Sequence, residues 1–319
     1  MINPTHGGQT EYIAAKNNPV EIKPSLAKIK PSVSNTTVVV AGAVFCAMLA
    51  GSPAQAGGNT MTFQDNFNAF NWSADGSHGW MTTYPWSGLR TLSGNNEAEC
   101  YTDPTVGTNP FSLAAGVLSL SAAPADPAHN PCHLPYTSGL ITTFKSFSQL
   151  YGIFEIRARM PSGQGLWPAF WLLPSSGAYS SELDVFEVLE NATTTLYSTT
   201  HGIINGAWGA DSQKLNVADT TTQFHVYSVD WEPKTITFRI DGKVTATAPT
   251  PSSMNTPMFM LINLAVGGWG SWPGTPDGST PFPAKLQIDW ARAYATANTQ
   301  IVTGNNAIVH IGAAGLTAH

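Results

Sequence analysis

The chain has 319 residues, a formal net charge of −6 and only 11% charged residues. It is long enough for one large domain or two ordinary ones. No stretch gathers lysine or arginine, which argues against a nucleic acid or an anionic membrane surface as the partner. Glycine, proline and tryptophan are abundant, and long Ala/Glu/Lys/Leu-rich segments are missing. This composition favours an extracellular, loop-rich β protein with a neutral partner.

Residues 1–56 are predicted to be an export signal. Four lysines precede the apolar run VVVAGAVFCAMLAG (38–51), and an Ala-x-Ala site follows at Ala54 to Ala56. This order of a basic region, an apolar core and small residues is typical of a cleaved signal. The run is shorter than the ~20 residues that span a bilayer. We therefore expect cleavage after Ala56 and secretion, extracellular or periplasmic, with an uncleaved anchor as the alternative.

Two cysteines remain after cleavage, Cys100 and Cys132. In an exported chain, two cysteines favour a single disulfide between them. Two free thiols are the alternative.

Strand patterns run through residues 57–295, without an internal repeat or a dividing linker. Apolar and polar residues alternate, or β-branched and aromatic residues cluster between turn signals, which is typical of strands. The clearest runs lie at residues 151–160, 224–249, 258–266 and 285–294. Many short strands predict an all-β fold, an antiparallel β-sandwich of the jelly-roll type. Residues 296–319 have a weak pattern and are predicted to be a weakly structured tail with at most one strand.

The stretch SSELDVFEVLENATT (180–194) concentrates acidic residues in a chain that has few charges. As a helix it would begin with a capping box at Ser181. Its neighbours, an apolar run ended by a turn and a run rich in threonine, favour a strand instead. In a strand, Glu182 and Asp184 share a face, and one β-bulge before Glu187 brings that side chain to the same face.

Three carboxyl groups on one face predict acid/base chemistry. Like charges at close range cannot all ionise cheaply, so at least one pKa is expected to rise. Two carboxyl groups about 5 Å apart suit retaining hydrolysis of a glycosidic bond, in which one attacks and the other protonates the leaving oxygen. We interpret the fourth acid of the stretch, Glu190, as a solvated side chain.

The segment GLWPAFWLLP followed by ELDVFE resembles the active-site region of glycoside hydrolase family 16, in the branch with an E-x-D-x-x-E signature. NNEAECYTD (95–103), YGIFEIRARMP (151–161), FHVYSVDWEPKTITFRIDG (224–242) and NLAVGGWGSWPGTPD (263–277) are similar to family segments in the same order. The resemblance covers residues 60 to 295. It is strongest to bacterial endo-β-1,3-1,4-glycanases and succinoglycan depolymerases.

The resemblance implies a jelly roll with an open groove on its concave sheet, and it implies roles for the acidic residues. Glu182 would be the nucleophile, Glu187 the general acid/base, and Asp184 would hydrogen-bond to the nucleophile and tune it. Further residues match family positions beside the groove and are expected to contact substrate. They are Asn96, Glu97, Trp167, Trp171, His201 and Trp272. Core packing is the alternative for Trp167 and Trp171, and a structural role is the alternative for His201.

The resemblance requires no cofactor. Some members of the family hold a structural calcium ion away from the groove, and Asp289 occupies the matching position. Calcium needs a cage of six to eight oxygen ligands, and a single aspartate does not supply it. A structural calcium ion is therefore allowed but not required.

The function expected from these observations is a secreted, monomeric endo-β-glucanase that acts on a neutral or weakly charged polysaccharide. Two alternatives stay open. A non-catalytic carbohydrate-binding jelly roll has the same fold but no need of three crowded carboxyl groups. A transglycosylase would use a sugar hydroxyl in place of water in the second step.

Overall fold

The structure, a computed structural model, describes residues 59–303, 308–312 and 315–318. The predicted export signal lies outside the described residues. Within the described ranges, no helix is long and apolar enough to cross a bilayer. The helical elements described there are three single turns of 3-10 helix. They are η1 (Ser93–Asn95), η2 (Pro104–Val106) and η3 (Pro127–His129).

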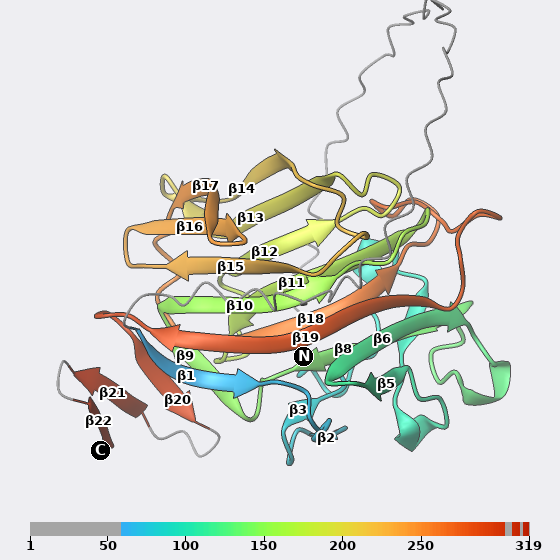
Figure 1. Cartoon of the computed structure of the whole chain (residues 1–319), viewed down its shortest axis with the longest axis horizontal. Helices are drawn as coiled ribbons and strands as arrows, with labels where there is room; N and C mark the ends of the chain where they lie inside the picture. The colour runs from blue at the N-terminus through green and yellow to red at the C-terminus, as the bar shows by residue number, and fades with distance from the viewer. Residues whose placement is uncertain (1–58, 304–307, 313–314, 319) are drawn as a thin grey trace, which may run out of the picture. The chain divides into compact units, whose positions relative to one another are not determined.

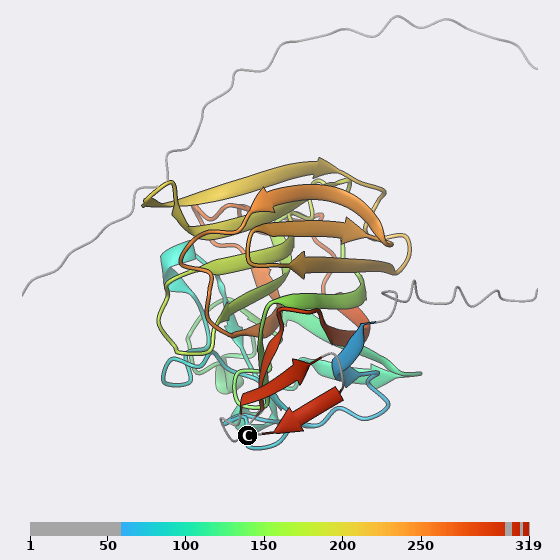
Figure 2. The same cartoon turned by 90° about the vertical axis from the view of Figure 1, so that its left-hand side faces the viewer.

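Two β-sheets form the body of the protein (Figures 1 and 2). The first contains β1 (Thr60–Asp65), β4 (Glu99–Tyr101), β5 (Phe111–Ala114), β6 (Val117–Pro124), β7 (Tyr136–Ser138), β10 (Gly152–Arg159), β15 (His225–Trp231), β16 (Thr235–Ile240), β17 (Lys243–Pro249) and β19 (Ala284–Ala295). Its order is β17-β16-β15-β10-β19-β6-β7-β4, with β1 beside β19 and β5 beside β6.

The second sheet carries the acidic stretch. It contains β2 (Trp72–Ser73), β3 (Trp80–Met81), β8 (Leu140–Thr142), β9 (Phe147–Leu150), β11 (Leu166–Pro174), β12 (Glu182–Val188), β13 (Thr195–Ile204), β14 (Ala207–Asn216), β18 (Met258–Val266), β20 (Gln300–Thr303), β21 (Ile308–Gly312) and β22 (Gly315–Ala318). Its order is β14-β13-β12-β11-β18-β9-β20-β21-β22, with β8 beside β18. The short pairs β2–β3 and β4–β7 are parallel, whereas the long strands pair antiparallel.

One hydrophobic core fills the space between the sheets. In β10, Phe154, Ile156 and Ala158 alternate into it and are completely buried. The central strand β18 is buried along its whole length because its two faces belong to different clusters. Met260 faces the inter-sheet core, while Phe259 joins a smaller aromatic cluster on the outer face. The predicted β-sandwich is confirmed.

The C-terminal segment contains more strand than its weak pattern indicates. Residues 300–303 form β20, which pairs with β9, and β21 and β22 continue the sheet. Ile301 is 4% exposed and belongs to the inter-sheet core. A strand of four residues is too short for alternation to be recognised, and its pairing partner lies about 150 residues earlier in the chain.

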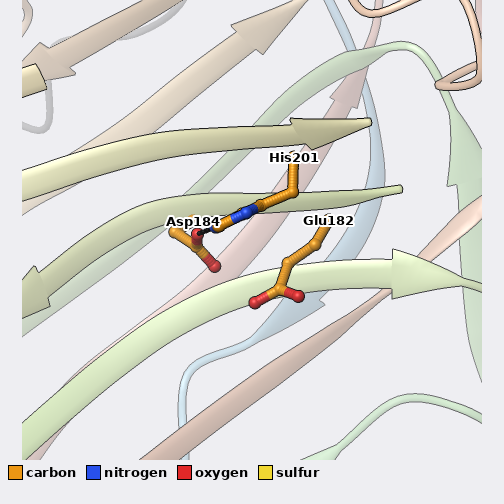
Figure 3. Close-up of side chains that lie close together, drawn as sticks. All are labelled: Glu182, Asp184 and His201. Carbon is orange, nitrogen blue, oxygen red and sulfur yellow. Dashed lines mark ion pairs between the residues drawn. The ribbon is translucent and has the colours of Figure 1, made fainter. Parts of the chain in front are cut away.

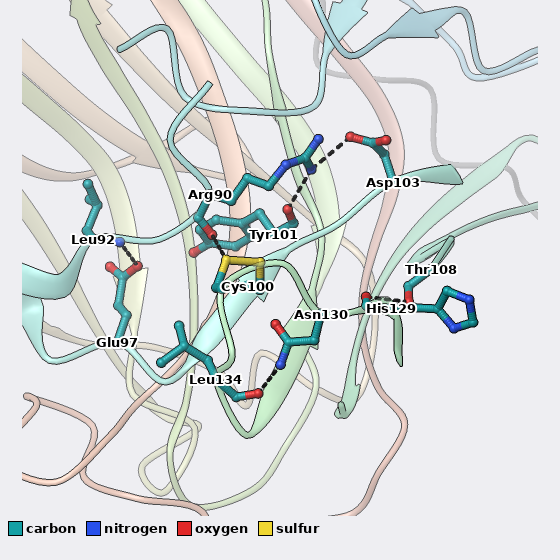
Figure 4. The surroundings of a disulfide bond; sticks show 11 residues. Arg90, Leu92, Glu97, Cys100, Tyr101, Asp103, Thr108, His129, Asn130 and Leu134 are labelled. Carbon is teal, nitrogen blue, oxygen red and sulfur yellow. Dashed lines mark hydrogen bonds and ion pairs between the residues drawn. A yellow bond between two sulfur atoms is a disulfide. The ribbon is translucent and has the colours of Figure 1, made fainter. Parts of the chain in front are cut away.

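The predicted disulfide is present and ties a loop to β4 (Figure 4). It joins Cys100, which is completely buried, to Cys132. Beside it, the guanidinium of Arg90 donates to the carbonyl oxygen of Tyr101 at 2.8 Å and pairs with Asp103 at 2.9 Å. These contacts hold the chain that follows β3 against the end of the sandwich.

Removing the disulfide is expected to destabilise the fold by about 2–4 kcal/mol, because the bridge closes a loop in the unfolded chain. The variant is Cys100→Ala combined with Cys132→Ala, and the measurement is the free energy of unfolding from urea titration. Wild-type protein denatured with dithiothreitol present should lose a similar amount. Equal stability of the oxidised wild type and the double variant would contradict the prediction.

Candidate active site

The acidic stretch is a strand with a bulge, as the sequence predicts, so the helical alternative is wrong. Glu182 pairs with His201 and Glu187 pairs with Tyr197 on β13, with a register shift between them. Val185 and Phe186 are successive residues and are both buried in the inter-sheet core. The two consecutive inward side chains return the next residue to the outer face. Glu182, Asp184 and Glu187 therefore share the outer face of the second sheet.

Asp184 is the buried centre of this group, with 2% of its surface exposed. Its Oδ2 lies 3.1 Å from Nε2 of His201, which reaches across from β13 (Figure 3). Burial by itself would lower the pKa of His201. The hydrogen bond to Asp184 and the charges of Asp184 and Glu182 outweigh that effect and raise the pKa above its usual value. His201 thus lies at the site, as expected.

Glu182 lies at the start of β12 and is partly exposed. Burial and the neighbouring charge of Asp184 raise its pKa to about 8, while the charge of His201 and a hydrogen bond from Tyr179 oppose that rise. The Tyr179 hydroxyl donates to Oε2 of Glu182. Sequence reasoning missed Tyr179, because it lies in a Ser/Gly-rich connection where no periodic pattern marks it.

Glu187 lies at the other end of the bulge. Burial raises its pKa well above the usual value, and the charges of Asp184 and Glu182 add to the effect. The indole of Trp167 donates to its Oε1 at 3.1 Å. Trp272 packs edge-on against Trp167, with ring centroids 5.5 Å apart, and is 47% exposed. Trp167 and Trp272 thus lie beside the acid/base candidate.

Trp171 does not lie on an accessible surface. It is 7% exposed and belongs to the outer aromatic cluster, where Tyr84 covers it with ring centroids 6.2 Å apart. Its indole donates to Asn263 at 2.8 Å, and Asn263 donates to the Tyr101 hydroxyl at 2.9 Å. The expected substrate contact is wrong for Trp171, because the chain after β3 folds over this part of the sheet. The alternative of core packing is the correct one.

Asn96 and Glu97 differ in accessibility. Asn96 is exposed and lines a pocket of about 460 Å³ together with Gly268 and Trp269. Glu97 is 8% exposed, and its carboxylate accepts from the backbone N–H of Leu92 at 3.0 Å. Glu97 thus shapes the loop that lines the pocket.

A second buried carboxyl, Glu99, adjoins Glu97 beneath this loop. Oε2 of Glu99 accepts from the backbone N–H of Val266 at 2.8 Å. Burial raises the pKa of Glu99 well above its usual value, and the charge of Glu97 and a hydrogen bond between the two carboxyl groups raise it further. These effects favour the protonated form of Glu99.

Glu190 is buried, with 2% of its surface exposed, so its interpretation as a solvated residue is wrong. Its backbone N–H donates to Leu166 at 3.0 Å and its carbonyl accepts from Gly163 at 3.1 Å. These bonds draw the loop after β12 against the start of β11 and turn the side chain inward. Burial raises the pKa of Glu190 well above its usual value.

The position expected for calcium does not fit a metal ion. Asp289 accepts from the guanidinium of Arg157 at 2.5 Å, so a cation of the chain already compensates its charge. Among the described residues, a set with metal-like spacing occurs in the active site itself. The ligand atoms of Glu182, Asp184 and His201 lie within 4.8 Å of one another. Acid/base chemistry accounts for that set, and we assign no ion to it.

The family profile of glycosyl hydrolases family 16 matches residues 99–292, a range that contains the bulged strand. The chain belongs to this family. An endo-1,3-1,4-beta-glycanase, EglC, of Rhizobium meliloti (strain 1021) is 41% identical over 245 residues, which cover 74% of this chain and 52% of EglC. A second endo-1,3-1,4-beta-glycanase of that organism, ExsH, is equally similar over 246 residues and 52% of its length.

The fold is also that of a solved laminarinase. The laminarinase catalytic domain from Thermotoga maritima MSB8 superposes with a TM-score of 0.62 at 27% identity, covering 75% of this chain and 99% of that domain. The chain spans about half the length of the curated relatives EglC and ExsH.

The stability of the protein is expected to depend on pH through Glu99. In the unfolded chain Glu99 ionises near its ordinary pKa of 4.5. The folded chain keeps the proton to much higher pH, so it binds more protons than the unfolded chain, and the free energy of unfolding falls as pH rises. A glutamine is neutral and supplies the same donor and acceptor.

In Glu99→Gln this contribution is absent, so the variant should gain stability relative to wild type as the pH rises above about 4.5, the ordinary pKa of the carboxyl group. The measurement is the free energy of unfolding from urea titration at each pH, for both proteins. Parallel curves for the two proteins would contradict a proton held by Glu99.

Proposed function

We propose that the chain is a retaining endo-β-glycosidase that hydrolyses internal bonds of a β-glucan or a related exopolysaccharide. One observation carries the proposal, namely the bulge that sets Glu182, Asp184 and Glu187 on one accessible face. Their surroundings differ in a way that supports separate roles. Glu182 has two partners that favour its ionised form, Tyr179 and His201. Among the residues that the structure describes, Trp167 favours the ionised form of Glu187, and two like charges oppose it.

In the first step, protonated Glu187 gives its proton to the glycosidic oxygen as the bond to the anomeric carbon breaks. The Glu182 carboxylate attacks that carbon from the opposite side and forms a glycosyl ester. Asp184 lies between the two glutamates and, with His201, holds a compensated charge next to the nucleophile. The shortened polymer leaves with its new hydroxyl group.

In the second step, Glu187 is a carboxylate and takes a proton from water. The resulting hydroxide equivalent attacks the anomeric carbon, and the Glu182 carboxylate departs with the electron pair of the ester bond. Two inversions restore the original β configuration. Glu187 regains its proton, so the enzyme is ready for another cycle.

The substrate class is inferred from the surface around the carboxyl groups. Exposed rings such as Trp272 offer faces on which neutral sugar rings stack. The chain gathers no lysine or arginine, which sulfate groups would require. The two similar relatives are named endo-1,3-1,4-beta-glycanases. A 1,3-linked or mixed 1,3-1,4-linked β-glucan is the substrate that fits these observations.

We also propose that the protein acts outside the cytoplasm as a monomer. The export pattern of residues 1–56 supports secretion. The disulfide between Cys100 and Cys132 supports an oxidising compartment. Analysis of the mature N-terminus and of the mass in solution tests this assignment, and a cytoplasmic, uncleaved product would contradict it.

Replacing the nucleophile is expected to abolish cleavage while the fold is retained. Wild type and Glu182→Gln are incubated with laminarin, lichenan, succinoglycan and agarose, and product lengths are followed over time. Internal cleavage releases a mixture of oligosaccharides early in the reaction. Asp75→Asn, an acid-to-amide change in an exposed loop, is the matched control and should keep full activity. Equal activity of Glu182→Gln and wild type would remove Glu182 from this role.

The first products are expected to have the β configuration, because two inversions retain it. The anomeric form is read by NMR during the first minutes, before mutarotation. Initial α products would exclude the double displacement. Products longer than the starting oligosaccharides would instead identify a transglycosylase, and binding without any cleavage would identify a carbohydrate-binding module.

Replacing the proton donor Glu187 is expected to slow the reaction by an amount that depends on the leaving group. Glu187→Gln should slow polymer cleavage by about 10²–10⁴-fold, the usual contribution of general acid/base catalysis. An aryl β-oligoglucoside with an acidic phenol needs no proton on departure, so its first step should be nearly unaffected. The release of phenol and of sugar are measured in parallel. Because Glu187 also serves the second step, the first step is read from the initial burst of phenol, and an equally large loss in that burst would contradict the assignment of Glu187 as the acid.

A further inference from the structure

Two exposed aromatic side chains lie on the Glu182 side of the site, apart from the rings around Trp272. Tyr179 is 55% exposed and Trp208 is 45% exposed. Their ring centroids are 5.4 Å apart, with an angle of 47° between the planes. The reaction steps above use neither ring. Exposed apolar groups gathered at one place commonly mark a functional surface.

Trp208 is fixed on the active-site face by the hairpin of β13 and β14. Asn205 and Gly206 have φ values of 52° and 85°, which are typical of the two central residues of a type I′ turn. The register pairs His201 with Ala210. Trp208 is two residues from Ala210 in the same strand, so its side chain lies on the same face as His201.

Tyr179 connects this hairpin to the nucleophile. It belongs to the connection between β11 and β12, three residues before Glu182. Its hydroxyl donates to Oε2 of Glu182, and its ring packs against Trp208. Trp208 lies on β14, whereas Glu182 lies on β12. The ring of Tyr179 is therefore supported by a strand other than the one that carries the nucleophile.

We propose that Tyr179, supported by Trp208, is a positioning residue for the nucleophile Glu182. The inference rests on the proposed function, in which one oxygen of Glu182 attacks the anomeric carbon. With Oε2 engaged by the hydroxyl, Oε1 is the oxygen available for attack. After attack, Oε2 becomes the carbonyl oxygen of the glycosyl ester and still accepts the same hydrogen bond. The carboxyl plane therefore keeps its orientation through both steps.

The hydroxyl also acts on the charge of Glu182. Burial and Asp184 raise the pKa of this carboxyl, while His201 and Tyr179 lower it. Removing the hydroxyl removes one of the two groups that favour the carboxylate, so Glu182 should lose its proton only at higher pH.

The test is the variant Tyr179→Phe, which keeps the ring against Trp208 and removes only the hydroxyl. The substrate is whichever of laminarin, lichenan and succinoglycan the wild type cleaves. We expect kcat to fall about tenfold with little change in KM, because the lost bond joins a hydroxyl to a charged oxygen. We also expect the acid limb of the kcat/KM profile to move to higher pH.

Two further variants separate positioning from a general effect on the fold. Trp208→Ala removes the support of the ring and should move the acid limb in the same direction, by less. Tyr151→Phe makes the same chemical change in the turn between β9 and β10 and should leave both kcat and the profile unchanged. If the acid limb of the kcat/KM profile lies at the wild-type pH in both Tyr179→Phe and Trp208→Ala, the proposal is overturned.

The outcome is distinguishable from failure of the proposed function. If Glu182→Gln is inactive while Tyr179→Phe behaves as wild type, the hydrolase stands and the positioning role is wrong. If Glu182→Gln is as active as wild type, the nucleophile itself is misassigned, and the role of Tyr179 fails with it.

Discussion

The site depends on the burial of Val185 and Phe186 as neighbours in the core of the sandwich. Phe186 packs against Tyr227 of the opposite sheet, with ring centroids 4.7 Å apart. The carbonyl of Val185 accepts from the Ser198 hydroxyl at 2.9 Å, so the bulge leaves this buried group satisfied. Burying one such side chain contributes about 1.5–3 kcal/mol. A slip to regular alternation would expose one of them and turn Glu187 away from the site.

The bulge gathers carboxyl groups that repel one another, and separate partners offset this cost. His201 pairs with Asp184, the Tyr179 hydroxyl binds Glu182, and the Trp167 indole binds Glu187. These partners come from β13, from the connection before β12 and from β11. Because each glutamate has its own partner, the two respond differently to the same crowding. Two chemically identical carboxyl groups need such a difference if one is to act as the acid and the other as the nucleophile.

The parts of the site that follow from local periodicity could be predicted from the sequence. Alternation with one inserted residue predicts the shared face of Glu182, Asp184 and Glu187, and the sandwich follows from many short strands. The burial of a side chain could not be predicted from the sequence where a segment distant in the chain covers that side chain. Trp171 is covered by Tyr84, and Glu190 is drawn inward by bonds to Gly163. Both depend on loop paths that leave no periodic signal in the chain.

The register of β12 and β13 also relates the carboxyl groups to the aromatic side chains around them. Glu187 pairs with Tyr197, which contacts Trp272 at 4.7 Å between ring centroids. Glu182 pairs with His201, and the hairpin that follows carries Trp208. One backbone irregularity therefore sets both the spacing of the glutamates and the spacing of the ring groups beside them. A change in the bulge would alter catalysis and sugar recognition together, whereas a change in the β13–β14 turn would alter the Glu182 side alone.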